Sequence, residues 1–450
     1  MAVIAQISQV SPALQQDATD PTQAIVARER LKSMMLRVWI LAGIFFMALP
    51  GTLLGFSNLM AISAHHGLGS LPAAWMEGHG HAQMFGWIGS FILGIGFYSQ
   101  PARGRSILKV PLTCFVLWIS GVAMRWYANI YGWHWRIFLP VSAAFEVIAV
   151  LLFLLAASHH KLPEPASGKR AKSRMELWMV SLLLGTTGLA ASVLFNFVEC
   201  LRLALAAVSP SFPHALDQRY LVLLGWGFLV PVVWGFSARW LPSFLAIAKP
   251  NDRVFSAALI LDMAGVLCGI SGWAKVATIL LAFGALASAV ALRLTEQPHA
   301  KAKSQGVHPS FPFFARIPYL WLVIAGSMSI WAAFADQHGG IWGASRHALT
   351  VGFAATMVFA MGPRILPHFG GIYRIFSTRL MFVSLLLLQA GCTLRVTSEP
   401  LAYEGLLAFA WKTLPLSGIL ELGGVLLFAA NLVLTFAFGR TAFAAGHDRD

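Results

Sequence analysis

The sequence predicts an all-α protein, a polytopic bundle of about twelve transmembrane helices. Hydrophobic residues make up 58% of the 450 residues and charged residues only 11%, with a mean hydropathy of +0.70. Soluble domains are about 45–50% apolar and about 25% charged. The apolar residues also gather into runs long enough to cross about 30 Å of hydrocarbon at about 1.5 Å per helical residue. Together these observations exclude a water-soluble fold.

Twelve apolar runs define the predicted spans. Only Ser271–Lys275 separate the seventh run from the eighth, so a different count at this pair is the alternative. The runs cover residues 36–62, 80–98, 107–124, 137–157, 177–201, 220–240, 254–273, 276–292, 317–335, 348–366, 378–396 and 414–438.

The spans form one predicted membrane domain, residues 35–440. It lies between an N-terminal tail, 1–34, which lacks the apolar core and cleavage site of a secretory signal, and a C-terminal tail, 441–450. The loops at 158–175 and 293–316 contain Pro, Lys and Ser and are predicted to be solvated, the second as a hinge. Neither loop is long enough to form a domain of its own.

The formal net charge of +14 raises the question of a nucleic-acid partner. The Lys and Arg residues lie between the apolar runs, however, and not in one patch, which argues against nucleic acid and for the lipid bilayer as the partner. With both termini cytoplasmic, the predicted topology places 24 of the 32 basic residues on the cytoplasmic side and 8 on the other. The sequence therefore predicts a multi-pass protein of the cell inner membrane.

The four cysteines are far apart in the sequence, and no C-x-x-C is present. They are expected to pack as small apolar residues. Because a C-x-x-C-H motif is also absent, the sequence gives no sign of covalently attached haem.

Histidines at the ends of spans are candidate ligands, because a polar side chain at membrane depth is costly and often functional. The second span opens with His79 and His81, and the tenth opens with His347. Even-numbered spans all begin on the outer side, so these imidazoles are expected at one depth, as two axial ligands of a haem iron require. The alternative is that each is an interfacial histidine satisfied by water; the spacing alone does not decide between these.

His79 and His81 are about 200° apart around a helix, so only one of them is expected to bind the iron. Glycines at 78, 80, 86, 89, 94 and 96 are expected to let a bulky ring lie close to the second span. The candidate metal ligands on the outer side are His79, His81, His347, His338 and His214.

Five acids fall within or at the ends of spans: Glu146, Glu199, Asp262, Asp336 and Glu421. Each could belong to a proton path. Pairing with a nearby base, such as Glu199 with Arg202 one turn away, is the alternative.

The sequence resembles the NnrS family. Its members are membrane proteins that are associated with nitric oxide metabolism and nitrosative stress and that contain haem and copper. The resemblance spans most of the chain and rests on three motifs. They are His79-x-His81-x-x-Met84-Phe85-Gly86, Arg239-x-x-Pro242-x-Phe244, and a run that starts at His347-Ala348-Leu349-Thr350-Val351-Gly352, continues through Met357, Met361 and Arg364, and ends at His368-Phe369-Gly370-Gly371.

Two positions depart from the family pattern. Gln83 stands where the family has an acid, and Gln100-Pro101-Ala102-Arg103 stands where it has an Asn-Trp-Thr-Gly-like run. These departures weaken the expectation of any acid-dependent step.

The family is distantly similar to the catalytic subunit of haem-copper oxidases and nitric oxide reductases, which have twelve spans and haem ligands on the second and tenth. Those enzymes use three more histidines on the sixth and seventh spans, whereas 220–240 and 254–273 contain none here. An oxidase or proton pump of that design is therefore not expected. Copper, if bound, would use outer-side residues such as His65, His66, His214 or His338.

The resemblance implies a haem-binding membrane protein, with haem b and possibly copper, that acts in nitric oxide metabolism by ligand binding or by electron transfer from an unidentified donor. A transporter or export factor for a metal or haem-like molecule, and a structural or assembly partner, are the alternatives. At the cytoplasmic ends of even spans, Arg239 and Arg364 are expected to anchor structure. His368, about 32 Å from His347 along the helix, is not expected to share its iron, although the family element around it could hold a second cofactor.

Overall fold

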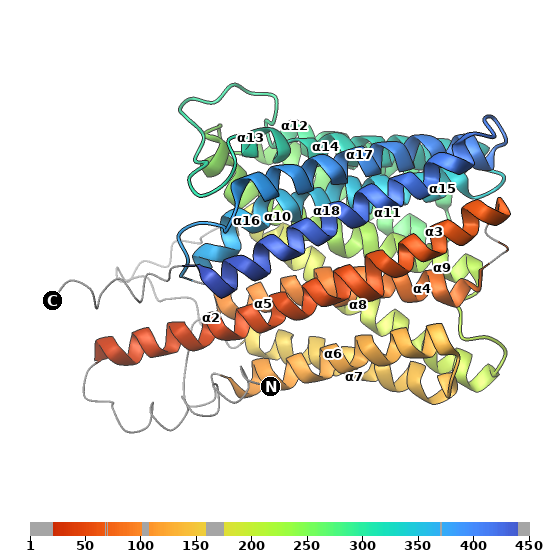
Figure 1. Ribbon diagram of the computed structural model, residues 1–450, viewed down its shortest axis with the longest axis horizontal. Helices are drawn as coiled ribbons and strands as arrows, with labels where there is room; N and C mark the ends of the chain where they lie inside the picture. The colour runs from red at the N-terminus through yellow and green to blue at the C-terminus, as the bar shows by residue number, and fades with distance from the viewer. Residues whose placement is uncertain are drawn as a thin grey trace.

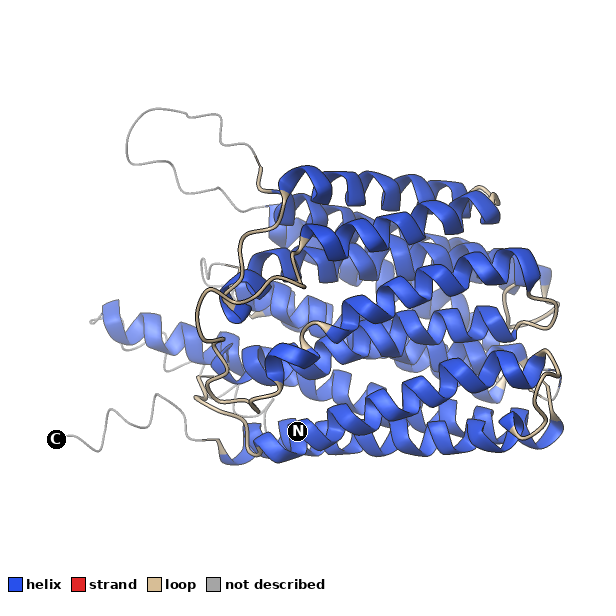
Figure 2. Ribbon diagram, turned by 90° about the horizontal axis from the view of Figure 1, so that it is seen from above, coloured by secondary structure: helices blue, strands red, loops and turns tan. Residues whose placement is uncertain are grey.

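The computed structural model of the protein describes residues 21–67, 69, 71–100, 108–158, 175–369 and 371–439. These residues form helices that run side by side along the longest axis of the molecule (Figure 1), and the same alignment is seen from above in Figure 2. The predicted all-α fold class is confirmed. Residues 1–20, 159–174 and 440–450, which include most of the two predicted tails and of the first loop, lie outside the described ranges.

The described ranges contain twelve rods, each of which is one long helix or several helical segments in line, and four of the rods are of the second kind. They are α2 (Pro21–Phe46) with η1 (Met47–Leu53) and α3 (Leu54–His65); α4 (Ala73–His81) with η3 (Ala82–Gly89) and α5 (Ser90–Ser99); α9 (His214–Val222) with η4 (Leu223–Leu229) and α10 (Val230–Leu245); and α15 (Gly340–His347) with η5 (Ala348–Ala355) and α16 (Thr356–Phe369). These are the first, second, sixth and tenth rods.

The other rods are single helices. They are α6 (Lys109–Tyr131), α7 (Trp135–Ser158), α8 (Leu177–Ala206), α11 (Asp252–Ile270), α12 (Ala274–Ala291), α14 (Ile317–Ala335), α17 (Thr378–Tyr403) and α18 (Ala410–Phe438), with a short turn of helix, α13 (Phe311–Phe314), before α14. Each predicted span lies largely within one rod, although α2 begins at Pro21, well before the predicted end of the N-terminal tail.

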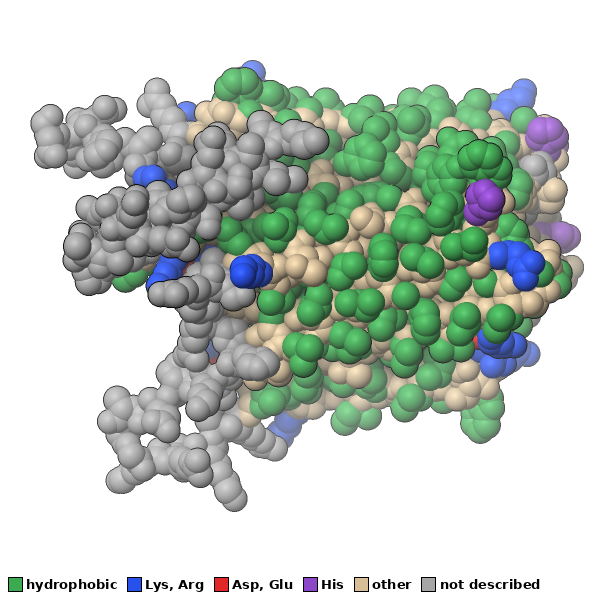
Figure 3. Space-filling model, turned by 90° about the horizontal axis from the view of Figure 1, so that it is seen from below, with side chains coloured by type: hydrophobic (Ala, Val, Ile, Leu, Met, Phe, Trp, Pro, Cys, Tyr) green, Lys and Arg blue, Asp and Glu red, His purple; other side chains and the backbone are tan. Residues whose placement is uncertain are grey.

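The flank of the bundle is apolar. Within the described ranges, eleven helical segments are long and apolar enough to cross a membrane, and the rod from Ala73 to Ser99 runs beside them. Large side chains such as Ile260, Phe283 and Leu386 are exposed on this flank, and Figure 3 shows hydrophobic side chains along it, with several basic ones near the two ends. A surface of this kind is suited to lipid and not to water. The protein is a multi-pass membrane protein.

Of the eleven long apolar segments, those of the sixth and tenth rods are the most buried, and most residues of the second rod between His81 and Phe97 are buried as well. The most apolar part of His214–Leu245 is 78% buried and that of Gly340–Phe369 is 67% buried, whereas the single-helix rods reach only 28% to 44%. Side chains on these rods therefore face protein on most sides, which makes them suitable for holding a polar site away from lipid.

The composite rods each contain a π-helical segment, a feature that occurs frequently at functional sites. A π turn leaves carbonyl groups that the regular helical ladder does not satisfy, and neighbouring side chains supply donors. Trp118 donates to the Phe85 carbonyl at 3.1 Å and Trp126 to the Pro50 carbonyl at 3.2 Å. The hydroxyl of Thr356 donates to the Val351 carbonyl, also at 3.1 Å. Trp118 and Trp126 lie on α6 and Thr356 directly follows η5, so both distant and adjacent side chains stabilise the irregular turns.

Close contact between α8 and η4 depends on a glycine. A Cβ atom at Gly188 would overlap the backbone carbonyl of Gly227, which cannot move aside as a flexible side chain would. Gly423 on α18 has room for a side chain, because a Cβ atom there would lie 3.6 Å from its nearest neighbour, a methyl group of Leu387.

We expect Gly188→Ala to lower the stability of the protein by about 1–3 kcal/mol, because the added methyl group forces α8 away from the sixth rod. Thermal unfolding in detergent measures this. Gly423→Ala is the matched control and should leave the unfolding temperature unchanged or raise it slightly, since alanine favours the helix. Equal effects of the two substitutions would contradict the packing described here.

The bundle has two ends, which we name by their contents. The histidine end is where α4 and α15 carry His79 and His347, and the N-terminal end is where α2 begins. At the N-terminal end, the loop predicted as a hinge is packed against the sixth and tenth rods. The backbone N–H groups of His299 and Lys303 donate to the Ala246 and Phe244 carbonyls at 2.8 Å each. Which end faces the cytoplasm stays a prediction.

Candidate functional site

His79 is held in one tautomer by the irregular turn of the first rod. Its Nδ1 lies 2.9 Å from the Gly51 carbonyl, and because a carbonyl can only accept, Nδ1 carries the proton. A neutral imidazole protonated at Nδ1 has its lone pair on Nε2. Gly55 lies against the His79 ring, so closely that a Cβ there would overlap it. The ring is therefore fixed in orientation and offers Nε2 as a ligand.

His347 is fixed by an acid from the twelfth rod. Its Nε2 lies 2.8 Å and 3.0 Å from the two carboxylate oxygens of Glu421. A hydrogen bond donated from Nε2 leaves Nδ1 as the ring nitrogen that carries a lone pair in the neutral form. A carboxylate that orients an imidazole in this way is the usual second partner of a metal-binding histidine.

The two histidines share one region of the histidine end. His79 interacts electrostatically with His347, Glu421 and Arg395, although His79 and His347 are 268 positions apart in the sequence. The sequence prediction that the second and tenth spans bring imidazoles to one depth agrees with this arrangement. Coordination itself stays a prediction.

Arg395 adds a cationic group to this region. Its Nε donates to Glu399 at 3.0 Å and its Nη2 to the other carboxylate oxygen at 3.2 Å. Its Nη1 is buried, and no hydrogen-bond partner is found for it in the described part of the chain. A buried guanidinium N–H without a partner is a donor available for an acidic group.

His81 belongs to a separate buried network. Its Nε2 lies 2.7 Å from the Glu146 carboxylate on α7, and its ring stacks on Phe85 at a centroid distance of 4.5 Å. His81 thus bonds to α7, whereas His79 bonds to the first rod and interacts electrostatically with the tenth and twelfth rods, in agreement with the opposite directions of the two side chains on the helix. Of the two candidates that the sequence left open, His79 is the one near His347.

The network around His81 continues through α8 to α6. The Asn196 amide donates to Glu146 at 3.1 Å and accepts from Arg125 at 3.2 Å. Arg125 also contacts Cys200 and donates to Glu77 at 3.0 Å. These polar side chains from four rods are almost fully enclosed, so the network fixes the relative positions of the second to fifth rods.

The glycines of the second span contact protein rings. The positions that Cβ atoms would take at Gly86, Gly89 and Gly94 are occupied by Phe46, Trp118 and Trp39, respectively. The expectation that these glycines leave room for a cofactor is therefore wrong over the inner part of the span. Gly80 differs, because nothing lies within 4 Å of its Cβ direction among the described residues.

The other predicted metal ligands are dispersed. His338 is exposed and lies 3.4 Å from Glu404, and His214 is exposed at the start of α9. His65 contacts the Ala61 carbonyl of its own helix, and His66 stacks on Trp411. No group of three or more His, Cys, Asp or Glu side chains that could hold a metal ion occurs within the described ranges. Copper thus has no assembled site there.

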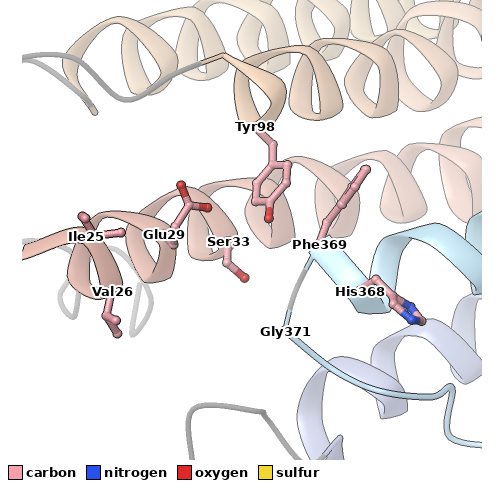
Figure 4. Close-up of a pocket in the computed structure, with 8 residues that line it drawn as sticks. All are labelled: Ile25, Val26, Glu29, Ser33, Tyr98, His368, Phe369 and Gly371. Atoms are coloured by element: carbon pink, nitrogen blue, oxygen red, sulfur yellow. The ribbon is translucent and has the colours of Figure 1, made fainter. Parts of the chain in front are cut away.

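His368 lies at the N-terminal end, as predicted, where its Nε2 is 3.2 Å from Arg364. It lines a pocket of about 220 Å³ together with Tyr98 and Glu29 (Figure 4). Ligand pockets usually measure about 300–1,000 Å³, so this one is small for a second macrocyclic cofactor. Arg364 also donates to the Lys303 carbonyl at 3.2 Å and lies over the Phe244 ring, which agrees with an anchoring role.

The chain was compared with known proteins. A family model described as "Domain of unknown function (DUF8744)" matches residues 303–437. None of the curated proteins matches the chain. Among solved structures, a chain of a heme-copper terminal oxidase dimer is similar, with a TM-score of 0.68 and 13% sequence identity, over 92% of this chain and 84% of that one. The likeness at this identity is one of fold. Distant similarity to the haem-copper oxidases is confirmed at that level, and the resemblance to the NnrS family stays a prediction.

Proposed function

We propose that this chain, which has the fold of a heme-copper oxidase chain, is a haem-binding membrane protein that carries electrons through a b-type haem. His79 and His347 would be the axial ligands. The observation that carries the proposal is the shared region of two oriented imidazoles from the second and tenth rods, each fixed by a hydrogen bond on the other nitrogen.

The number of ligands supports haem over a bare metal ion. A porphyrin supplies four nitrogen ligands to iron, so the protein needs to provide only two. The described residues offer two imidazoles in one region and no larger cluster of metal-binding side chains. Copper therefore stays a weaker prediction than haem b.

Two axial imidazoles favour electron transfer over binding of a small ligand. With His79 and His347 both holding the iron, a molecule such as nitric oxide would have to displace one of them to bind. The role in nitric oxide metabolism rests on the resemblance to the NnrS family, and the electron donor is unidentified.

The side chains around the two histidines would serve the bound group in defined ways. Glu421 holds the His347 ring and raises its basicity as a ligand. Gly51 holds the His79 ring through its carbonyl. The unpartnered Nη1 of Arg395 would donate to an acidic substituent of the porphyrin, such as a propionate, and the open space beside Gly80 would admit the ring edge.

The remaining predictions are consistent with this function. We propose residues 35–440 as one membrane domain and the cell inner membrane as its location, with the lipid bilayer as its partner and both termini in the cytoplasm. The excess of basic residues predicted for the N-terminal end supports this orientation.

A visible spectrum of the protein purified in detergent, with haem and metal analysis, tests the proposal. We expect about one non-covalent haem b per chain and a reduced spectrum that carbon monoxide does not change, because both axial positions are filled. A colourless protein that binds metal or haem weakly and reversibly would contradict electron transfer and favour the transporter. A spectrum that shifts fully with carbon monoxide would favour ligand binding.

A further inference from the structure

Asp262 is a buried acid for which no partner is found among the described residues. Asp262 lies on α11, ten positions after Asp252 and eight before Ile270, so it is about 15 Å from the start of the helix. Its relative exposure is 1%. Neither of its carboxyl oxygens has a hydrogen-bond partner in the described part of the chain. It is therefore a buried carboxyl group near the middle of the membrane.

The other four acids singled out in the sequence are all paired. Glu146 lies beside His81, and Glu421 lies beside His347. Glu199 lies 2.8 Å from Arg202, as predicted. Asp336 accepts hydrogen bonds from backbone N–H groups, including that of Trp342 at 2.7 Å. Asp262 thus differs from all four in having no group that would compensate a negative charge.

The surroundings of Asp262 are tight and apolar. On α12, a Cβ at Gly284 would lie 3.3 Å from the Asp262 backbone nitrogen, and one turn further along α11, a Cβ at Gly265 would lie 2.7 Å from Leu281. Ser288, one turn beyond Gly284 on α12, donates its hydroxyl to the Ala285 carbonyl of its own helix. A metal cation would need about six oxygen ligands, and Asp262 belongs to no group of three or more His, Cys, Asp or Glu side chains among the described residues.

The titratable groups on the helices that pack against α11 lie toward the histidine end. α12 carries only Lys275, at its start, and η4 carries none. Those of the remaining neighbours, α8 and α9, are Glu199, Cys200, Arg202, His214, Asp217, Arg219 and Tyr220. Arg219 lies beside Gly272, just beyond the end of α11. These groups do not form an ion pair with Asp262.

We propose that Asp262 is a proton-binding site within the membrane, and that its ligand is a single proton. An unpaired carboxylate in such surroundings would be far more costly than the neutral acid. Binding a proton neutralises the charge without further ligands, which a cation would need. The inference stands on the burial and isolation of this side chain and does not depend on haem binding.

Infrared spectroscopy of the purified protein tests the proposal. A protonated carboxylic acid has a carbonyl stretching band that a carboxylate lacks. We expect the difference spectrum between the wild type and Asp262→Asn to contain this band for one group, at neutral and at mildly alkaline pH. Asp252→Asn is the matched control, because Asp252 is exposed at the start of the same helix, and it should remove no such band at these pH values.

Labelling with a hydrophobic carbodiimide gives a second readout on the wild type, which covers the case that Asp262→Asn fails to fold. The carboxyl proton moves to a carbodiimide nitrogen and the carboxyl oxygen bonds to the central carbon. The adduct is thus the sum of the two molecules and rearranges to an N-acylurea. We expect one adduct on the peptide containing Asp262. A carboxylate signature at Asp262 with no adduct, or a protonated band that appears only when sodium and potassium are removed, would overturn the proposal.

Discussion

Replacing either His79 or His347 with alanine should remove the haem from the purified protein or leave it with a five-coordinate spectrum. Each substitution deletes one of the two proposed iron ligands and with it one coordinate bond to the iron. Glu421→Gln should act in the same direction but less strongly, weakening haem retention by about 10–100-fold, because it removes the partner that orients the His347 ring. Absorbance per mole of protein, together with electron paramagnetic resonance of the oxidised form, measures both effects.

His368→Ala is the matched control on the tenth rod. It changes the same residue type, but 21 positions and about 32 Å further along the helix, where His368 contacts Arg364. The haem content and spectrum should not change. Loss of haem in His368→Ala, with a normal spectrum in His347→Ala, would place the iron at the N-terminal end and overturn the assignment.

Arg125→Leu should be among the most destabilising single substitutions in the bundle. Arg125 is almost fully buried and joins Glu77 on the second rod to Asn196 on the fifth. Removing the guanidinium leaves the Glu77 carboxylate without its charged partner in an enclosed site, a loss of about 3–5 kcal/mol. We expect a low yield of folded protein and a markedly lower unfolding temperature in detergent.

The pair formed by Arg293 and Glu296 provides the comparison. It is also an ion pair of an arginine with a glutamate, at 2.7 Å, but both side chains are exposed to solvent, at 38% and 36%. Arg293→Leu should therefore change stability by about 0–1 kcal/mol. If the two substitutions lowered the unfolding temperature equally, the buried network would not be the stabilising element described here.

Hydrophobicity and charge alternation predicted the twelve rods and their side-by-side alignment. In an all-α protein, a bilayer can be crossed only by long apolar helices, and these have to lie roughly along one axis. The same alternation predicted that His79 and His347 begin at one depth. The partners of the histidines could not be predicted in this way. Glu421 is 74 positions from His347, and Gly51 acts through a backbone carbonyl that no residue type identifies.

The irregular turns were also beyond the sequence. Pro50 disturbs the first rod in a predictable way, but Ala82–Gly89 and Ala348–Ala355 contain no proline. The π geometry of Ala82–Gly89 is stabilised by Trp118, which lies close to it only after folding. The role of the glycines was misjudged for the same reason, because the sequence does not show that rings from other helices fill the space beside them.

The π turn between His81 and Ser90 has a consequence for the angular phase of the second rod. A π turn accommodates one more residue than the α-helix around it, and one residue corresponds to about 100° of rotation about the axis. The half that carries His79 and the half that carries Phe91 and Tyr98 are therefore offset by that angle relative to a uniform helix. Deleting a single residue such as Gly86 would restore uniform winding, and the two halves could not both keep their present neighbours. The number of residues in this turn, and not only their identity, thus determines which way the imidazole faces.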